Sequence, residues 1–122
     1  MRVFTIPGTL PGLNEYTLAN RSNRFGGAKM KRDAENVVRA AICAEKVKHI
    51  DGRYALTAIW AEPNRRRDPD NIQMGVKFIL DALVSLGIVD GDGQRHVGSI
   101  THIIGHDKAN PHIVVTLTEV PE

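Results

Sequence analysis

The sequence predicts an α+β (α/β-like) fold: a small mixed β-sheet with two helices packed on one face, in the order β-α-β-α-β-β. Three observations support it. Short runs rich in β-branched and aromatic residues, bounded by Gly, Pro and Asp, are typical of strands. Two longer runs place apolar residues three and four positions apart, as helices do. The alternation of the two kinds, closing on two strands, favours a two-layer sandwich.

The composition indicates one globular domain, residues 1–122. The chain is 42% hydrophobic and 25% charged, which is ordinary for such a domain. Its single cysteine, Cys43, excludes a disulfide framework and a cysteine-based metal site. A formal charge of +2 means that any nucleic-acid binding must come from local basic patches. We find no pattern typical of a signal peptide or a membrane span, and therefore expect a cytoplasmic protein without a membrane partner.

The N-terminal third combines a strand with a basic segment. Residues 2–6 are predicted to form the strand, and the Pro-Gly pairs at 7–8 and 11–12 end it. From Tyr16 to Arg32 the chain carries five cations and no acid. We interpret this segment as a mobile basic arm that lies on phosphate, with a solvated loop as the alternative. Its cations are Arg21, Arg24, Lys29, Lys31 and Arg32.

The middle of the chain predicts a helix followed by a strand. Residues 29–48 place small and apolar side chains on one helical face. Residues 53–61 alternate, with Tyr54 and Trp60 on one side and Ile59 on the other, so we expect both faces of this strand to be covered. Polar residues follow at its carboxyl end, which is where sheets with crossover helices usually bind ligands.

Residues 65–92 hold the most informative pattern. Three arginines, Arg65, Arg66 and Arg67, precede two carboxylates, Asp68 and Asp70. Asp68 is suited to the N-cap of a helix, and a proline follows at the first helical position. One helix is then predicted as far as Gly87. Its apolar face is formed by Ile72, Val76, Ile79, Leu80 and Leu83, and its polar face by Asp70, Met74, Lys77 and Asp81.

A second acidic cluster, Asp90 and Asp92, follows that helix, and two strands, 98–104 and 113–120, complete the chain as a hairpin. Hard carboxylate oxygens suit Mg²⁺, and guanidinium groups suit phosphate. Together they indicate metal-assisted phosphodiester hydrolysis. The alternative is structural, because Asp-Pro-Asp-Asn is also an ordinary helix start and Asp-Gly-Asp-Gly an ordinary turn. The spacing of His96, His102, His106 and His112 does not favour a histidine metal site.

Several motifs resemble those of the RusA-type Holliday junction resolvases. These are Arg-Arg-Asp-Pro-Asp-Asn at 66–71, Lys77, Asp-Ala-Leu at 81–83 and Gly-Ile-Val-Asp-Gly-Asp at 87–92. The resemblance is strong over residues 64–94 and weaker at 11–16. It implies a homodimer that binds four-way DNA junctions and nicks opposing strands with Mg²⁺ or Mn²⁺. The chain departs from the pattern in one respect: its lysine stands six residues after Asn71 instead of three, where Met74 lies.

The resemblance implies roles for individual residues. Asp68, Asp70 and Asp92, with Asp90 as the neighbouring candidate, are expected to bind the metal. Lys77 and Arg67 are expected to position the phosphate. Arg65 and Arg66 join the basic arm as DNA contacts. Two other functions are compatible with the same residues, namely a non-catalytic module that binds branched DNA and a metal-dependent phosphoesterase acting on another substrate.

Overall fold

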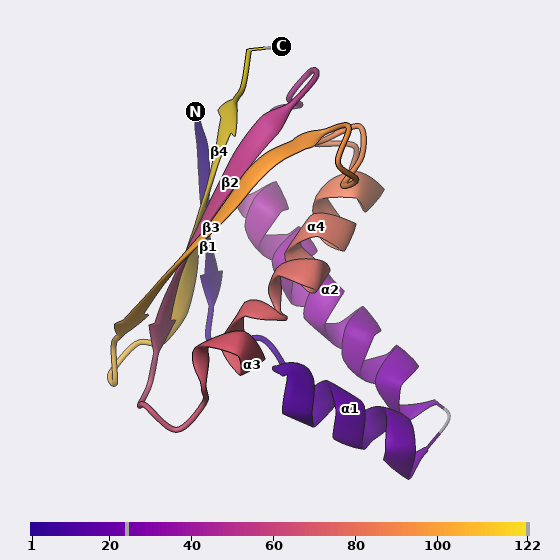
Figure 1. Ribbon diagram of the computed structural model, residues 1–122, viewed down its shortest axis with the longest axis vertical. Helices are drawn as coiled ribbons and strands as arrows, with labels where there is room; N and C mark the ends of the chain where they lie inside the picture. The colour runs from indigo at the N-terminus through magenta and orange to yellow at the C-terminus, as the bar shows by residue number, and fades with distance from the viewer. Residues whose placement is uncertain (24, 122) are drawn as a thin grey trace.

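A four-stranded mixed sheet forms one layer of the fold and helices form the other (Figure 1). The computed structural model describes residues 1–23 and 25–121. The strand order is β1-β4-β2-β3, with β1/β4 and β4/β2 antiparallel and β2/β3 parallel. The strands are β1 (Arg2–Pro7), β2 (Tyr54–Glu62), β3 (Val97–His106) and β4 (His112–Glu119).

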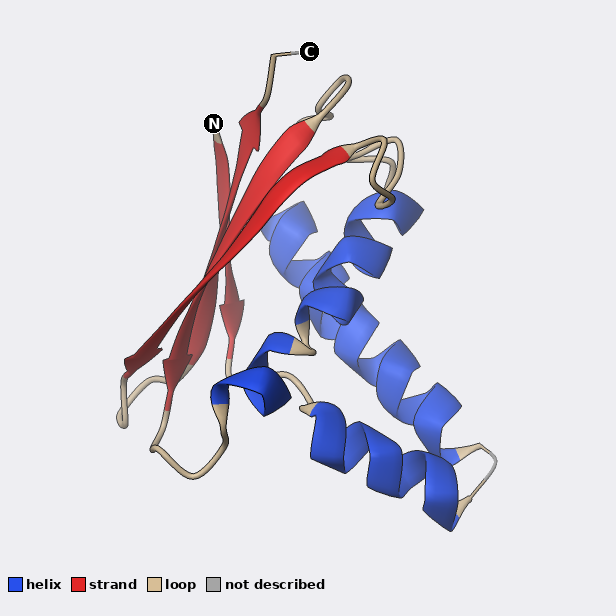
Figure 2. Cartoon of the chain, viewed as in Figure 1, coloured by secondary structure: helices blue, strands red, loops and turns tan. Residues whose placement is uncertain are grey.

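The helices of the described chain all lie on the same side of the sheet (Figure 2). They are α1 (Leu13–Ser22), α2 (Gly26–Ala44), α3 (Pro69–Gln73) and α4 (Val76–Ser85). Helices α2 and α4 supply buried side chains to the core, and α1 supplies none. None of the helices in these residues is long and apolar enough to cross a membrane. The predicted α+β class and the one-sided placement of the helices are confirmed.

Strand β2 is the centre of the core. Tyr54, Leu56, Ala58 and Trp60 alternate along it and are fully buried against the helices. On the other face, Ile59 is 37% exposed, so the prediction that both faces of this strand are covered was wrong. The reason is that all helices of the described residues cover the same face of the sheet.

The last two strands do not form the predicted hairpin. β4 lies between β1 and β2, whereas β3 pairs with β2 on the opposite side. The connection between β3 and β4 therefore crosses the end of β2. There the backbone N–H of Asp107 donates to the carbonyl of Glu62 at 2.9 Å.

The predicted mobile arm is largely helical. Helix α1 occupies 13–22 and α2 begins at Gly26, three residues earlier than predicted, and ends at Ala44. The start of α1 is fixed by hydrogen bonds, because the Glu15 carboxylate accepts the Gly12 N–H at 2.8 Å. With no buried residue, α1 lacks the apolar periodicity that identifies a helix in a sequence. Arg24 lies outside the described residues.

The helix predicted after Asp68 is broken into α3 and α4 at Met74 and Gly75. Successive N–H groups there bond three residues back, from Gly75 to Ile72 and from Phe78 to Gly75, both at 3.1 Å. Gly75 lies against Trp60, since a Cβ on it would stand 3.2 Å from two carbons of the indole ring. Met74, expected on the polar face, instead packs against the core.

A hydrogen bond between side chains joins β2 to the edge strand. The indole N–H of Trp60 donates to Nδ1 of His102 at 3.0 Å, and the two rings stack with centroids 5.8 Å apart. Nδ1 must be unprotonated to accept this bond. Burial lowers the pKa of His102 below its ordinary value of 6.5.

This lowered pKa predicts a pH-dependent stability. The unfolded chain takes up a proton at His102 near pH 6.5, whereas the folded chain resists it. The stabilisation is therefore fully present above pH 6.5 and is lost as the pH falls through the folded pKa. We expect the free energy of unfolding, measured by urea titration, to fall less steeply below pH 6.5 in His102→Asn, whose amide oxygen still accepts from Trp60. Identical slopes in the two proteins would contradict the assignment.

Candidate functional site

The two helix-start carboxylates, Asp68 and Asp70, lie just beyond the carboxyl end of β2. Asp68 has the extended backbone of an N-cap, with φ −72° and ψ 153°, and Pro69 follows at the start of α3. The Asp68 side chain nevertheless makes no capping hydrogen bond. Both carboxylates are exposed. This argues against the alternative that Asp68 serves only to start a helix, because its side chain is not held as a cap and its oxygens remain available to a cation.

Arg67 is not the free cation that the sequence predicts. Its guanidinium donates two hydrogen bonds to Glu62, both at 2.9 Å, and a third to the Leu10 carbonyl at 2.9 Å. Glu15 lies 3.5 Å away on its other side. The hydrogen bonds to Glu62 are the main cause that raises the pKa of Arg67. Because Glu62 is only 3% exposed, Arg67 has a structural role in the described chain, and the predicted contact of Arg67 with DNA stays a prediction.

The other two arginines of the triplet face solvent. Arg65 and Arg66 are exposed, and within residues 1–23 and 25–121 neither forms an ion pair. Arg66 lines a cleft of about 450 Å³ together with Glu15, Glu62 and Asn64. This end of the sheet therefore carries two exposed carboxylates, Asp68 and Asp70, and two exposed arginines that precede them closely in the sequence.

Asn71, the residue after the acidic pair, joins α3 to α1 through a hydrogen bond. It is buried, and its Oδ1 accepts the backbone N–H of Asn14 at 2.8 Å. Gly12 passes so close that a Cβ on it would stand 2.5 Å from the same oxygen. The contact fixes the start of α3 against the start of α1.

The second acidic cluster, Asp90 and Asp92, lies at the opposite end of the molecule. It follows α4, whose ten residues span about 15 Å. The turn contacts the beginning of β2, where the Tyr54 hydroxyl donates to the Gly91 carbonyl at 3.0 Å. Burial first, and the charge of Asp92 second, raise the pKa of Tyr54 to about 12. One chain therefore does not bring Asp92 together with Asp68 and Asp70.

Lys77 forms a surface pair. Its Nζ lies 3.7 Å from Oδ2 of Asp81, and Lys31 approaches the same oxygen at 3.6 Å. Lys77 was expected on the same polar face as Asp70 along one continuous helix, and the break at Met74 and Gly75 divides that helix. The described residues contain no ion pair between Lys77 and either helix-start carboxylate.

The predicted DNA-contacting cations lie on two neighbouring helices. Arg21 belongs to α1, whereas Lys29, Lys31 and Arg32 belong to the first turns of α2. Lys29 pairs with Asp33 at 2.6 Å. Arg21 and Arg32 are exposed and have no ion pair in the described part of the chain. Both helix segments lie at the same end of the molecule as α3 (Figure 1).

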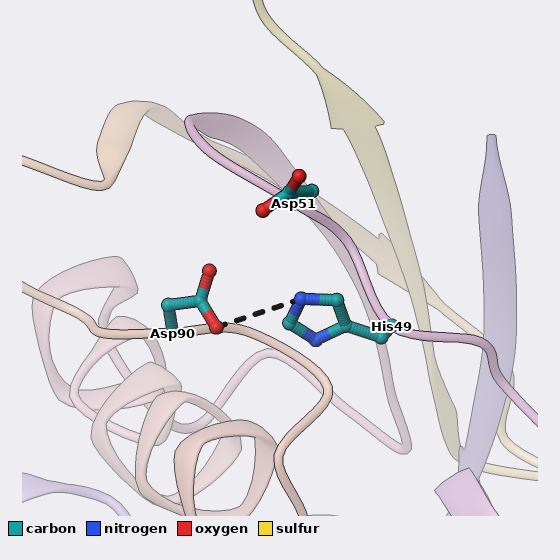
Figure 3. Close-up of side chains that lie close together, drawn as sticks. All are labelled: His49, Asp51 and Asp90. Atoms are coloured by element: carbon teal, nitrogen blue, oxygen red, sulfur yellow. Dashed lines mark ion pairs between the residues drawn. The ribbon is translucent and has the colours of Figure 1, made fainter.

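One group of possible metal ligands was not predicted. His49 and Asp51, in the segment before β2, stand beside Asp90, and their ligand atoms lie within 4.8 Å of one another (Figure 3). A sequence signal existed, because side chains two apart in extended chain point to the same side. The partner Asp90 could not be found in this way, since it is 39 positions beyond Asp51 in the sequence.

The chain matches no protein-family model and no curated protein. The similarity to the RusA-type resolvases therefore depends on the residues of 64–94 described above.

The buried pair of Arg67 and Glu62 predicts that removing one partner costs more stability than removing both. Replacing Arg67 with Met leaves the Glu62 carboxylate buried without its partner, and we expect a loss of about 3 kcal/mol in the free energy of unfolding. Adding Glu62→Leu should recover most of that loss, because no buried charge remains. Lys29→Met, which breaks an exposed pair, is the matched control and should cost less than about 1 kcal/mol. Urea unfolding measures all three; equal losses for Arg67→Met and Lys29→Met would contradict this role.

Proposed function

We propose that this protein is a metal-dependent endonuclease that acts on branched DNA, in the manner of the RusA-type resolvases it resembles. The observation that carries the proposal is the end of β2. Asp68 and Asp70 are exposed there, Asp68 is not used as a cap, and Arg65 and Arg66, which precede them in the sequence, are exposed without ion pairs among the described residues. A non-catalytic DNA-binding module would gain nothing from two free carboxylates on the surface that meets phosphate.

The residues have complementary roles in this proposal. Asp68 and Asp70 hold Mg²⁺ or Mn²⁺ through hard oxygen ligands, with water completing the coordination. The bound ion would lower the pKa of a water and neutralise charge on the phosphate. Arg65 and Arg66 hold phosphate oxygens through their planar guanidinium groups. Arg21 and Arg32 extend this basic surface along α1 and α2. A surface of this extent suits branched DNA, which is wider than a single groove of a duplex.

The distance between the acidic clusters bears on the oligomeric state. Asp92 follows α4 in a turn that contacts the start of β2, whereas Asp68 and Asp70 follow its end, so a metal centre that uses all three needs two copies of the chain. A homodimer, which the resemblance implies, supplies such a pair by symmetry. We therefore propose that each centre takes Asp68 and Asp70 from one chain and Asp92 from its partner.

Asp70→Asn tests the catalytic assignment. The change is nearly isosteric but removes a charge that the metal needs, so we expect cleavage of a synthetic four-way junction to be abolished in Mg²⁺ or Mn²⁺. Binding of the junction should persist, and tighten if anything, because one anion facing phosphate is gone. Glu45→Gln, an exposed carboxylate beyond the far end of α2, is the control. Cleavage by Asp70→Asn at the rate of the unaltered protein would overturn the metal assignment, and no cleavage by the unaltered protein would overturn the function.

Mixed dimers test whether the centre is shared. Asp70→Asn and Asp92→Asn should each be inactive alone. After the two are mixed and allowed to exchange, about half of the dimers contain one chain of each kind. In a shared arrangement, such a dimer has one centre with both changes and one with neither. It should therefore nick a single strand of the junction, which a denaturing gel detects. An inactive mixture, or an active Asp92→Asn protein, would contradict the shared centre but not the function.

A further inference from the structure

The segment between α2 and β2 is held in place by an unusual number of hydrogen bonds for a stretch without helix or strand. The Arg2 guanidinium donates to the carbonyls of Lys48 at 3.1 Å and of His49 at 2.8 Å. The next N–H, that of Ile50, donates to the Ile88 carbonyl at 2.7 Å, and Ile50 is fully buried. The backbone on both sides of the His49 side chain is thus fixed against β1 and against the turn after α4.

The same contacts determine how the His49 ring is oriented. Its Nδ1 lies 2.8 Å from the Gly87 carbonyl, and a carbonyl only accepts, so Nδ1 carries the hydrogen. In the neutral ring, Nε2 then carries the lone pair. Nε2 faces Oδ1 of Asp90 at 3.5 Å (Figure 3). A histidine whose second nitrogen donates to a backbone carbonyl is the arrangement that metal-binding histidines usually show.

The third member of the group is Asp51. It lies two residues after His49, and the ligand atoms of the three residues are within 4.8 Å of one another. Two ligands of a tetrahedral Zn²⁺ ion, each about 2.1 Å from the metal, stand about 3.4 Å apart. The 3.5 Å between His49 and Asp90 already has that length, and it is longer than the 2.7–2.9 Å typical of a charge-assisted hydrogen bond.

We propose that His49, Asp51 and Asp90 bind a divalent transition-metal ion. One imidazole nitrogen and two carboxylates favour Zn²⁺ over Mn²⁺, and both over Mg²⁺, which prefers oxygen ligands alone. All three residues are exposed, so water completes the coordination. The ion ties the segment before β2 to the turn after α4. Within one chain this site lies at the opposite end of α4 from Asp68 and Asp70. It uses Asp90 and not Asp92, and it does not depend on the proposed nuclease activity.

Calorimetric titration of the whole protein with ZnCl₂ tests the site. We expect one Zn²⁺ per chain at this site, and at least tenfold weaker binding in each of His49→Gln, Asp51→Asn and Asp90→Asn. The matched control is His112→Gln, because Nδ1 of His112 lies 3.8 Å from Oδ2 of Asp107 in a similar contact that lacks a third ligand. It should leave the affinity unchanged. Circular dichroism checks that each variant is folded.

A second set of measurements separates this site from the proposed nuclease centre. In the Asp68→Asn, Asp70→Asn double variant, Zn²⁺ should bind with unchanged affinity, and MgCl₂ should produce no binding at the His49 group. Zn²⁺ should shift the imidazole NMR signals of His49 and not those of His112. Affinity weaker than about 1 mM, or affinity unaffected by His49→Gln and Asp51→Asn, would overturn the proposal. Absence of DNA cleavage by the unaltered protein would leave these results as they stand.

Discussion

The bidentate pair between Arg67 and Glu62 is the constraint on which the candidate site depends. Glu62 ends β2, and its carbonyl also accepts the N–H of Asp107 from the connection between β3 and β4. Arg67 then reaches the Leu10 carbonyl and approaches Glu15 on α1. A guanidinium suits this role because its five donors point in fixed directions within one plane. One side chain thus joins the end of the sheet, the loop after β1 and the first helix of the chain.

Asp68 follows Arg67 directly in the chain, so its position depends on the same pair. The cost of burying two charges is offset only when their hydrogen bonds are nearly complete, as those of Arg67 are. Such a buried pair contributes more to holding the surrounding chain in one defined arrangement than to the net free energy of unfolding. It holds the short segment from Asn64 to Asp68 without help from regular secondary structure. Asp68 and Asp70 can therefore stay exposed to solvent, although the Asp68 side chain makes no capping hydrogen bond.

Parts of the fold with strong local periodicity could be predicted from the sequence. The buried side of β2 was identified correctly, because it repeats at the spacing of a strand. On α4, Ile79 and Leu83 were identified, whereas the buried Phe78 and Ala82 were not, because the break at Gly75 turns the face that one continuous helix would present. Helix α1 could not be found, since it has no fully buried residue and is held by the hydrogen bond from Asn14 to Asn71 and by the contact of Tyr16 with Phe78. The position of β4 between β1 and β2 depends on pairings between distant residues, on which local patterns carry no information.

The candidate site shows the same division. The hypothesis that Asp68 and Asp70 bind a metal comes from residue type and spacing. The contacts of Arg67 and His49 could not be predicted in this way, because their partners, Glu62 and Asp90, are recognised only in the folded chain. The two acidic clusters were correctly placed at the two ends of a helical stretch. A helix of ten residues, however, keeps the two clusters of one chain apart.

The break between α3 and α4 allows the number of residues between the two helices to vary. Here the lysine stands three residues further from Asn71 than in the RusA-type pattern, and the break at Met74 and Gly75 falls within that interval. Three residues are close to one helical turn. An insertion of that size at a break leaves Ile72 on one side and Phe78 on the other both facing the core. The break therefore accommodates the gain or loss of about one turn while both the acidic pair and the packed helix are kept.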